Sequence, residues 1–393
     1  MNSENRRKRA VIAGAGIAGL ATALRLHRAG WEVLVIERAP ARRSSGYLVN
    51  LGGSGYDAAE RLGLLPALTA HDIGWFTSVL VHADGRKKFT VPTAIAETAG
   101  GSRTLSLFRG DVETVLYEAV RDAVTIRFDT TVDTVTQHAD GVRVVLSDGE
   151  AVQAELLVGA DGVHSRVRKL IFGSDTDHRV DLQHIVAALP LPRMPVDVPE
   201  GAGATYIGPG RTAAVINMGP RRSSAFFTYR ASDSAAEVAR GPVLALREIF
   251  GDLGGGVPDV LRHLESDPDT AYFDSVSQIV MDRWSSDRVV LVGDAAWCVT
   301  PFAGYGVALA LLGAEQLGTL LDEHGDDIPT AAAHWEQLLR PEVRKRQALA
   351  RKGATRFAPP SKLHVLIGDL TMRAMALPGI RGVILRSIQR ANA

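Results

Sequence analysis

An apolar run that leads into a glycine-rich turn constrains this chain more than any other feature. Residues 11–13 predict a buried strand, and residues 17–29 have the spacing of a helix. Gly14, Gly16 and Gly19 form the pattern Gly-x-Gly-x-x-Gly between them. In this pattern the first glycine makes a tight turn, the second lets the backbone approach a pyrophosphate, and the third lets helix pack on strand. The segment therefore predicts a dinucleotide-binding turn.

The residues after this helix complete a strand–helix–strand unit. Gly30 ends the helix, residues 31–36 predict a second strand, and Glu37 follows it where an acidic side chain would hold a ribose. We expect Ala18 in the turn and Arg38 beside Glu37 to contact the ligand as well. Because the free N–H groups and the dipole of the helix face the turn, phosphates would bind at that end.

The composition argues against several other classes of protein. The chain has 393 residues, enough for two or three domains. Lys+Arg and Asp+Glu both total 44, so the zero net charge gives no support for a nucleic-acid partner. A single cysteine, Cys298, and histidines without ligand spacing predict neither an internal disulfide nor a metal site. We find no membrane-spanning run and no signal peptide, and we expect a cytoplasmic protein without stable membrane association.

Two later stretches resemble parts of a nucleotide-binding domain. Residues 142–146 and 151–158 predict a hairpin whose second strand ends near Asp161 and Gly162. Residues 288–292 predict a buried strand that runs into Asp294, and a long apolar helix follows. The nucleotide-binding domain is therefore expected to be assembled from three separated stretches of the chain.

In this order, the motifs resemble those of the single-component FAD-dependent aromatic hydroxylases. This family includes para-hydroxybenzoate hydroxylase and the tetracycline-inactivating monooxygenases. The resemblance spans residues 9–345 and rests on the glycine turn with Glu37, on Asp161 and Gly162 with Ser165 and Arg168, and on Asp294 with Pro301, Gly304 and Gly306. It implies bound FAD, transient NADPH or NADH, and O2. It also implies hydroxylation of an aromatic or polycyclic small molecule through a flavin hydroperoxide.

The resemblance also implies roles for individual residues. Arg109 would reach the phosphate and ribitol region of FAD, unless it is a surface arginine at a helix start. Asp161 would serve FAD and the nicotinamide cofactor, unless it only caps a helix. Asp294 would bind the ribityl chain, and Pro301 with the backbone of Gly304 to Gly306 would lie against the isoalloxazine ring. No catalytic side chain is assigned, since the dipole of the helix that begins near Gly306 would favour reduced flavin.

Four positions depart from the family's pattern. Trp297 and Tyr305 stand where many members have His and Gln, and Ala308 and Gly313 stand where they often have Asn and Asp. The pyrimidine edge of the flavin would then rely on backbone donors alone. This departure motivates an alternative function, an FAD-containing oxidase or a redox-neutral cyclase. A non-catalytic flavin sensor is a third hypothesis, and a large separate sheet domain argues against it.

The predicted fold class is α/β, with a Rossmann-type FAD-binding domain, an inserted antiparallel β-sheet substrate domain and a C-terminal helical segment. The expected boundaries are 1–74, 103–175 and 276–345 for the FAD-binding domain, 75–102 and 176–275 for the substrate domain, and 346–393 for the C-terminal helices. Tyr206, Met218 and Phe227 are candidate substrate contacts, although strand alternation leaves open which face meets the flavin. The sequence leaves open whether the protein is a monomer or a homodimer, which substrate it takes, and whether it prefers NADH or NADPH.

Overall fold

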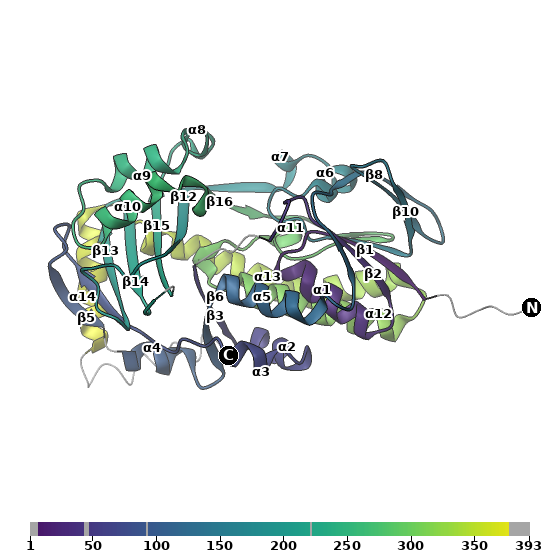
Figure 1. Cartoon of the computed structure of the whole chain (residues 1–393), viewed down its shortest axis with the longest axis horizontal. Coiled ribbons are helices and arrows are strands. Elements are labelled where there is room, and N and C mark those ends of the chain that lie inside the picture. Colours follow the sequence, from purple (N-terminus) through teal and green to yellow (C-terminus); the bar gives the residue numbers. More distant parts are fainter. Residues whose placement is uncertain (1–6, 43–46, 92, 221, 377–393) are drawn as a thin grey trace, which may run out of the picture.

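The structure is a computed structural model, and it describes residues 7–42, 47–91, 93–220 and 222–376. Figure 1 shows two sheet-based halves, joined by the long strands β12 (Arg179–Leu191) and β16 (Tyr272–Ile279). One half contains a mainly parallel sheet and the other a mainly antiparallel sheet. The predicted α/β fold class is therefore confirmed.

The parallel sheet brings the three sequence motifs to one edge. Its strands are β1 (Arg9–Ala13), β2 (Glu32–Ile36), β7 (Thr125–Arg127), β11 (Leu156–Gly159), β17 (Ser285–Ser286) and β18 (Val289–Leu291). They lie in the order β17-β18-β11-β1-β2-β7, and only the β17–β18 pair is antiparallel. Ala13 pairs with Ile36 and with Gly159, so the carboxyl ends of three strands meet there. Ligands of such sheets bind beyond this edge.

Helices from distant parts of the chain cover this sheet or pack against the helices that do. They include α1 (Ile17–Arg28), α2 (Ser54–Arg61), α3 (Leu65–Thr69), α5 (Arg109–Val120), α12 (Gly306–His324) and α13 (Ile328–Phe357). In Figure 1, α1, α5 and α12 lie together below the sheet, and α1 contacts both α5 and α12. The predicted helix over 17–29 is confirmed, and α13 continues through Pro341 as one helix.

The hairpin predicted from residues 142–146 and 151–158 is confirmed, but its second strand is not continuous, because the chain forms two strands that belong to different sheets. β10 (Ala151–Ala154) pairs with β9 (Val142–Leu146), which in turn pairs with β8 (Val132–Gln137). The next strand, β11, joins the parallel sheet beside β1. Glu155 lies between them, and its carboxylate accepts a hydrogen bond of 2.6 Å from the Arg9 N–H. Strand propensity could not predict this change of partner.

The second half is built on a seven-stranded sheet in the order β16-β12-β15-β14-β13-β4-β5. The newly named strands are β4 (Thr77–Val81), β5 (Lys87–Val91), β13 (Ala202–Gly208), β14 (Arg211–Asn217) and β15 (Ser223–Arg230). The sequence analysis placed an antiparallel sheet in residues 75–102 and 176–275, and these ranges contain all of the strands of this sheet except the end of β16. The β13–β4 pair is parallel and the other pairs are antiparallel.

The two faces of this sheet have different neighbours. Helices α8 (Ser234–Arg240), α9 (Pro242–Phe250) and α10 (Val257–Ser266), which were not predicted, cover one face and share a core with Phe227. The other face packs against residues 302 and 357 through Val186 and Phe226. Strand alternation therefore separates Phe226 from Phe227.

The remaining elements are short segments and one terminal helix. They are β3 (Leu48–Gly52), β6 (Thr104–Phe108), α4 (Thr93–Gly100), α6 (Arg166–Phe172), α7 (Asp175–His178), η1 (Pro268–Thr270), α11 (Asp294–Trp297), η2 (Pro301–Ala303) and α14 (Lys362–Ala376). Within the described ranges, no helix is long and apolar enough to cross a bilayer. Of the C-terminal helices expected over 346–393, the structure shows the end of α13 and α14, and residues 377–393 lie outside the described residues.

Candidate functional site

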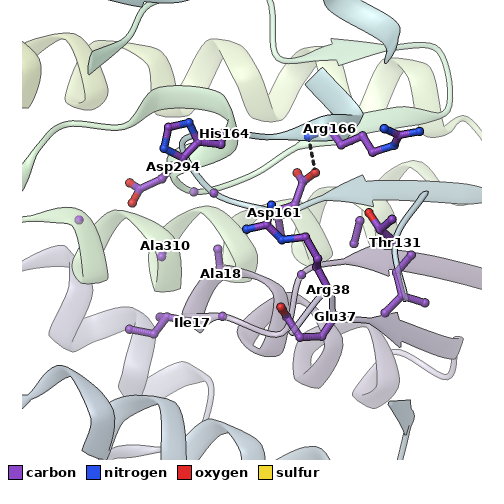
Figure 2. Close-up of a pocket in the computed structure, with 18 of the residues that line it drawn as sticks. Ile17, Ala18, Glu37, Arg38, Thr131, Asp161, His164, Arg166, Asp294 and Ala310 are labelled. Atoms are coloured by element: carbon purple, nitrogen blue, oxygen red, sulfur yellow. Dashed lines mark hydrogen bonds between the residues drawn. The ribbon is translucent and has the colours of Figure 1, made fainter. Parts of the chain in front are cut away.

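A pocket of about 520 Å³ opens at the carboxyl edge of the parallel sheet. Figure 2 shows Glu37 and Arg38 entering it after β2, Asp161 and His164 after β11, and Asp294 from the chain that follows β18. The three motifs that are far apart in the sequence thus line one cavity.

The three glycines of the first turn differ in what surrounds them. Protein atoms crowd two of them, whereas the third faces open space. An added Cβ at Gly14, whose φ is +109°, would lie 2.4 Å from the Ala160 carbonyl oxygen. One at Gly19 would lie 1.9 Å from the Gly14 carbonyl oxygen, and Gly19 does not line the pocket. At Gly16, which does line it, an added Cβ would meet nothing within 4 Å. The space beside Gly16 is therefore free for a ligand.

Two helix N-termini border the pocket. Helix α1 begins at Ile17 and α12 begins at Gly306, and both residues belong to the lining, as does Val307. Neither helix has a side-chain cap at this end. The first N–H groups of each helix and its dipole therefore favour negative charge in the pocket.

Glu37 and Arg38 provide charges of opposite sign at the end of β2. The Glu37 carboxylate accepts hydrogen bonds of 2.8 Å from the N–H groups of Ala15 and Ala39, which orient it at the turn. Arg38 lines the pocket without a hydrogen-bond or ion-pair partner among the described residues. A phosphate or a ribose at this end would meet both side chains.

Asp161 is a helix cap in the structure. Its carboxylate accepts hydrogen bonds from the N–H groups of Arg166 at 2.7 Å and Val167 at 3.1 Å (Figure 2 draws the first). It also accepts one from the Ser165 hydroxyl at 2.5 Å. The capping interpretation is therefore correct for the carboxylate, while Asp161 and Gly162 still line the pocket. Any ligand contact of Asp161 must share an oxygen with these donors.

Arg168 connects the second motif to the third. Its side chain is fully buried and donates to the Ala295 carbonyl oxygen at 2.8 Å and to that of Val163 at 2.6 Å. It also forms an ion pair of 2.6 Å with Asp175. Because Ala295 follows Asp294 in α11, Arg168 fixes the short helix that presents Asp294.

We expect Arg168→Ala to destabilise the apoprotein by about 3 kcal/mol, because it leaves buried acceptors unpaired. Lys169→Ala is the matched control, since Lys169 forms an ion pair of 2.8 Å with the same carboxylate but has a 48% exposed side chain. Its expected cost is below about 1 kcal/mol. The midpoint of urea unfolding measures both, and equal losses would contradict this role of Arg168.

Asp294 projects into the pocket beside Arg109. Asp294 is exposed to the pocket, yet desolvation by the surrounding protein raises the pKa of its carboxyl above the ordinary value of 3.8, while the charge of Arg109 and a hydrogen bond with Cys298 lower it. Arg109 begins α5, lines the pocket and pairs with Glu113 at 2.8 Å. It is therefore at a helix start, as one interpretation held, but its side chain is not at the outer surface.

The turn before α12 has strained backbone. Thr300 has a φ of +74° and a buried hydroxyl oxygen for which the structure shows no partner among the described residues. Such backbone strain in a non-glycine residue is concentrated at functional sites. Pro301 and Gly304 follow in this turn, yet they do not belong to the lining of the pocket, whereas Gly306 does. Their expected contact with the flavin ring stays a prediction.

Packing explains the apolar character of α12. An added Cβ at Gly55 would lie 2.3 Å from the Ala308 Cβ, so α2 contacts α12 directly at this position. One at Gly313 would lie 2.9 Å from the Trp297 ring. Neither Ala308 nor Gly313 lines the pocket, whereas Ala310 does. Larger polar side chains at these two positions would collide with neighbouring elements.

The structure does not bring the three candidate substrate residues to this pocket. Phe227 is fully buried on the helix-covered face, with its ring centroid 4.9 Å from that of Phe250. Tyr206 lines a separate cavity of about 290 Å³ on that face. Met218 follows β14 and is half-buried. A substrate role for these residues therefore has no geometric support at the pocket.

Other lining residues were missed in the sequence. They are Tyr47, Thr130, Thr131, His164, Arg166 and Lys169. His164 and Arg166 follow Asp161 closely, and that proximity was a usable signal, whereas nothing in the sequence pointed to Tyr47.

Two tyrosines mark one end of the site. The rings of Tyr47 and Tyr272 lie 6.4 Å apart, and burial raises the pKa of both hydroxyls. Tyr272 nevertheless keeps 41% of its surface accessible, and it is not among the residues that line the pocket. Nearby, His164 and Asp274 lie 3.0 Å apart.

The comparison with known families decides the identity of this site. A family model described as an FAD binding domain matches residues 7–327. The chain belongs to this FAD-binding family. The resemblance inferred from the three motifs is thereby confirmed, and the protein is an FAD-dependent monooxygenase of this type.

Relatives of this monooxygenase match nearly its whole length. An uncharacterized protein of Mycobacterium tuberculosis is 33% identical over 365 residues, which cover 90% of this chain and 95% of the relative. The FAD-dependent monooxygenase asL4 of Sarocladium schorii is 29% identical over 399 residues, with 93% and 92% covered.

Solved structures share the fold. The tetracycline destructase Tet(55) has a TM-score of 0.79 and 25% identity, covering 95% of this chain and 97% of its own. HpxO of Klebsiella pneumoniae, crystallised with FAD, has a TM-score of 0.79, 22% identity and 98% coverage of each chain.

The pocket of this FAD-dependent monooxygenase fits its cofactor on physical grounds. The open space beside Gly16 and the two uncapped helix N-termini suit a pyrophosphate and an electron-rich ring. Arg38 offers a positive charge that no described residue pairs with, and Asp294 offers acceptors for hydroxyl groups. No feature of the described lining conflicts with FAD.

Proposed function

We propose that this protein is an NAD(P)H-dependent FAD monooxygenase that uses O2 to hydroxylate an aromatic or polycyclic small molecule. The observation that carries the proposal is the N-terminus of α12 in the lining of the pocket, close to the turn that packs on the antiparallel sheet. Bound FAD supplies the redox chemistry, accepting a hydride and passing electrons to O2. The protein supplies position, charge and the exclusion of water.

In this proposal, the lining residues bind and orient FAD without taking part in proton transfer. Gly14 and Gly16 admit the pyrophosphate at the N-terminus of α1, and Glu37 holds the adenosine ribose. Asp294 and Arg109 hold the ribityl and phosphate region. The N–H groups at the start of α12 stabilise negative charge that develops on the ring during reduction.

We further propose that the substrate lies beside Tyr47 and Tyr272. Their rings converge at the end of the site where Arg109 and Asp294 also lie, and aromatic side chains favour a flat apolar ligand. Tyr272→Ala should raise KM for an accepted substrate by about tenfold and leave FAD affinity unchanged. An unchanged KM would remove Tyr272 from the substrate site.

The test of the function is the fate of labelled oxygen. Purified protein loaded with FAD is mixed with NADPH or NADH and candidate phenols under ¹⁸O₂, and the products are analysed by mass spectrometry. Incorporation of one ¹⁸O atom, with oxidation of the nicotinamide, supports the proposal. Product without the label, or oxidation of substrate without any nicotinamide, would instead favour the oxidase or redox-neutral alternative.

That alternative was motivated by the absence of polar residues at positions 308 and 313. Both positions are explained by packing, since Ala308 contacts Gly55 and Gly313 faces Trp297. The argument for an oxidase or a redox-neutral cyclase is therefore weaker. The labelled-oxygen experiment distinguishes the two functions.

A further inference from the structure

We infer that Tyr305 and Arg346 act as a pair of positioning residues that fix the N-terminus of α12 and thereby set the affinity and the reduction potential of bound FAD. Tyr305 is the residue immediately before α12, and Gly306, which follows it, lines the pocket. A shift of Tyr305 would therefore move the N–H groups that face the cofactor.

Tyr305 connects the start of α12 to α2. The Tyr305 hydroxyl lies 3.1 Å from the Ser54 hydroxyl at the start of α2. An added Cβ at Gly53 would lie 2.9 Å from the Tyr305 hydroxyl oxygen, and Gly53 has a φ of +55°. The phenol therefore occupies a slot that the Gly53 backbone leaves open.

Arg346 connects the start of α12 to α13. The Arg346 guanidinium carbon lies 3.6 Å from the centroid of the Tyr305 ring, and the Arg346 side chain is 11% exposed. Glu342, one helical turn earlier, holds the guanidinium by an ion pair of 2.6 Å. A cation over an aromatic face is worth most when water is excluded, as it largely is here.

Other contacts from α13 reach the same turn. Gln347 donates to the Ile279 carbonyl oxygen at 2.7 Å, and its amide nitrogen lies 3.5 Å from the Cys298 carbonyl oxygen. The ring of Phe357 stacks on that of Phe302 in η2, with centroids 4.7 Å apart. Helix α13 thus holds the strained turn at both ends, and Arg346 holds the end next to the pocket.

The N-terminus of α12 also affects the reduction potential of the flavin. Reduced flavin carries more negative charge than oxidised flavin, and an ordered α12 N-terminus favours it. Loosening this end should therefore weaken the binding of reduced FAD more than that of oxidised FAD. By linkage, the reduction potential must fall when that happens.

A double-mutant cycle on the full-length protein tests the pair. The variants are Tyr305→Leu, Arg346→Met and both together, and the measurements are FAD affinity by fluorescence titration and reduction potential by dye equilibration. We expect each single change to weaken FAD binding by about tenfold, the size of a desolvated cation–π pair, and to lower the potential. The double variant should lose little more than either single variant, because the two residues act together.

Conservative variants and a matched control separate positioning from stability. Tyr305→Phe retains the ring over Arg346 and should lose less affinity than Tyr305→Leu. Arg340→Met is the control, since Arg340 also lies on α13, pairs with a glutamate one turn earlier and stacks 4.5 Å from the Trp284 ring, away from this turn. It should alter the melting temperature without altering the potential.

Two results would overturn the inference. One is additive effects in the cycle, and the other is an Arg346→Met potential that equals that of the Arg340→Met control. If Arg346→Met does not fold, Tyr305→Leu with Tyr305→Phe still decides, because equal potentials in those two variants would exclude a role of the stacked ring.

Discussion

Gly16→Val should fold like the wild-type protein and lose FAD binding by more than about a hundredfold, since the second glycine of the turn admits the pyrophosphate. An added Cβ at Gly16 meets nothing within 4 Å, and the φ of −79° suits any residue. The side chain would therefore occupy only the space reserved for the ligand. FAD titration and the melting temperature of the apoprotein measure the two parts of this prediction.

Gly19→Val is the matched control, and it should destabilise the apoprotein rather than block the ligand space. A Cβ at Gly19 would lie 1.9 Å from the Gly14 carbonyl oxygen, so the helix could not pack on the strand. We expect the apoprotein itself to be destabilised by at least about 3 kcal/mol. If Gly16→Val instead lowered the melting temperature as much as Gly19→Val, the open space beside Gly16 would not be the pyrophosphate site.

Asp294→Asn should separate cofactor binding from stability. Loss of the charged acceptor should weaken FAD binding by roughly one to two orders of magnitude, the range for a hydrogen bond to a charged group. FAD titration at pH 7 measures this loss. Unchanged FAD content in the variant would mean that the third motif does not hold the ribityl chain.

The same substitution should stabilise the apoprotein at neutral pH. Because desolvation raises the pKa of Asp294 in the folded state above 3.8, the folded state binds this proton more tightly than the unfolded state. The wild-type protein therefore loses stability as the pH rises from about 3.8 through the folded-state pKa. The advantage of Asp294→Asn should be present at pH 7 and absent below this window. Urea unfolding at both pH values checks the sign, and an advantage that grows at low pH would contradict it.

Local patterns in the sequence predicted a large part of the pocket lining. Gly14, Gly16 and Gly19 act through backbone geometry, which depends on neighbours close in the chain. The strand ends that carry Glu37 and Asp294 were predictable for the same reason, since a buried strand followed by a turn is a local signal. These positions all belong to the motifs on which the family resemblance was based.

Interactions between distant segments could not be predicted in this way. Strand alternation predicts that Phe226 and Phe227 point to opposite faces of the sheet. Only the packing of α9 against Phe227 shows that the face of Phe226 is the one that meets the turn before α12. Likewise, the carboxylate of Asp161 could be assigned to a ligand or to a helix cap, and the start of α6 decided for the cap.

Short-range spacing was therefore enough to predict the α/β class, the family and several residues that line the pocket, among them Gly14, Gly16 and Asp294. Only the folded chain shows that Tyr47 and Tyr272 share one end of the site and that Arg346 stacks on Tyr305. It also shows that Ala308 and Gly313 are packing positions. In each case the partner lies on another element, and side-chain contacts across elements leave no periodic signal in the sequence.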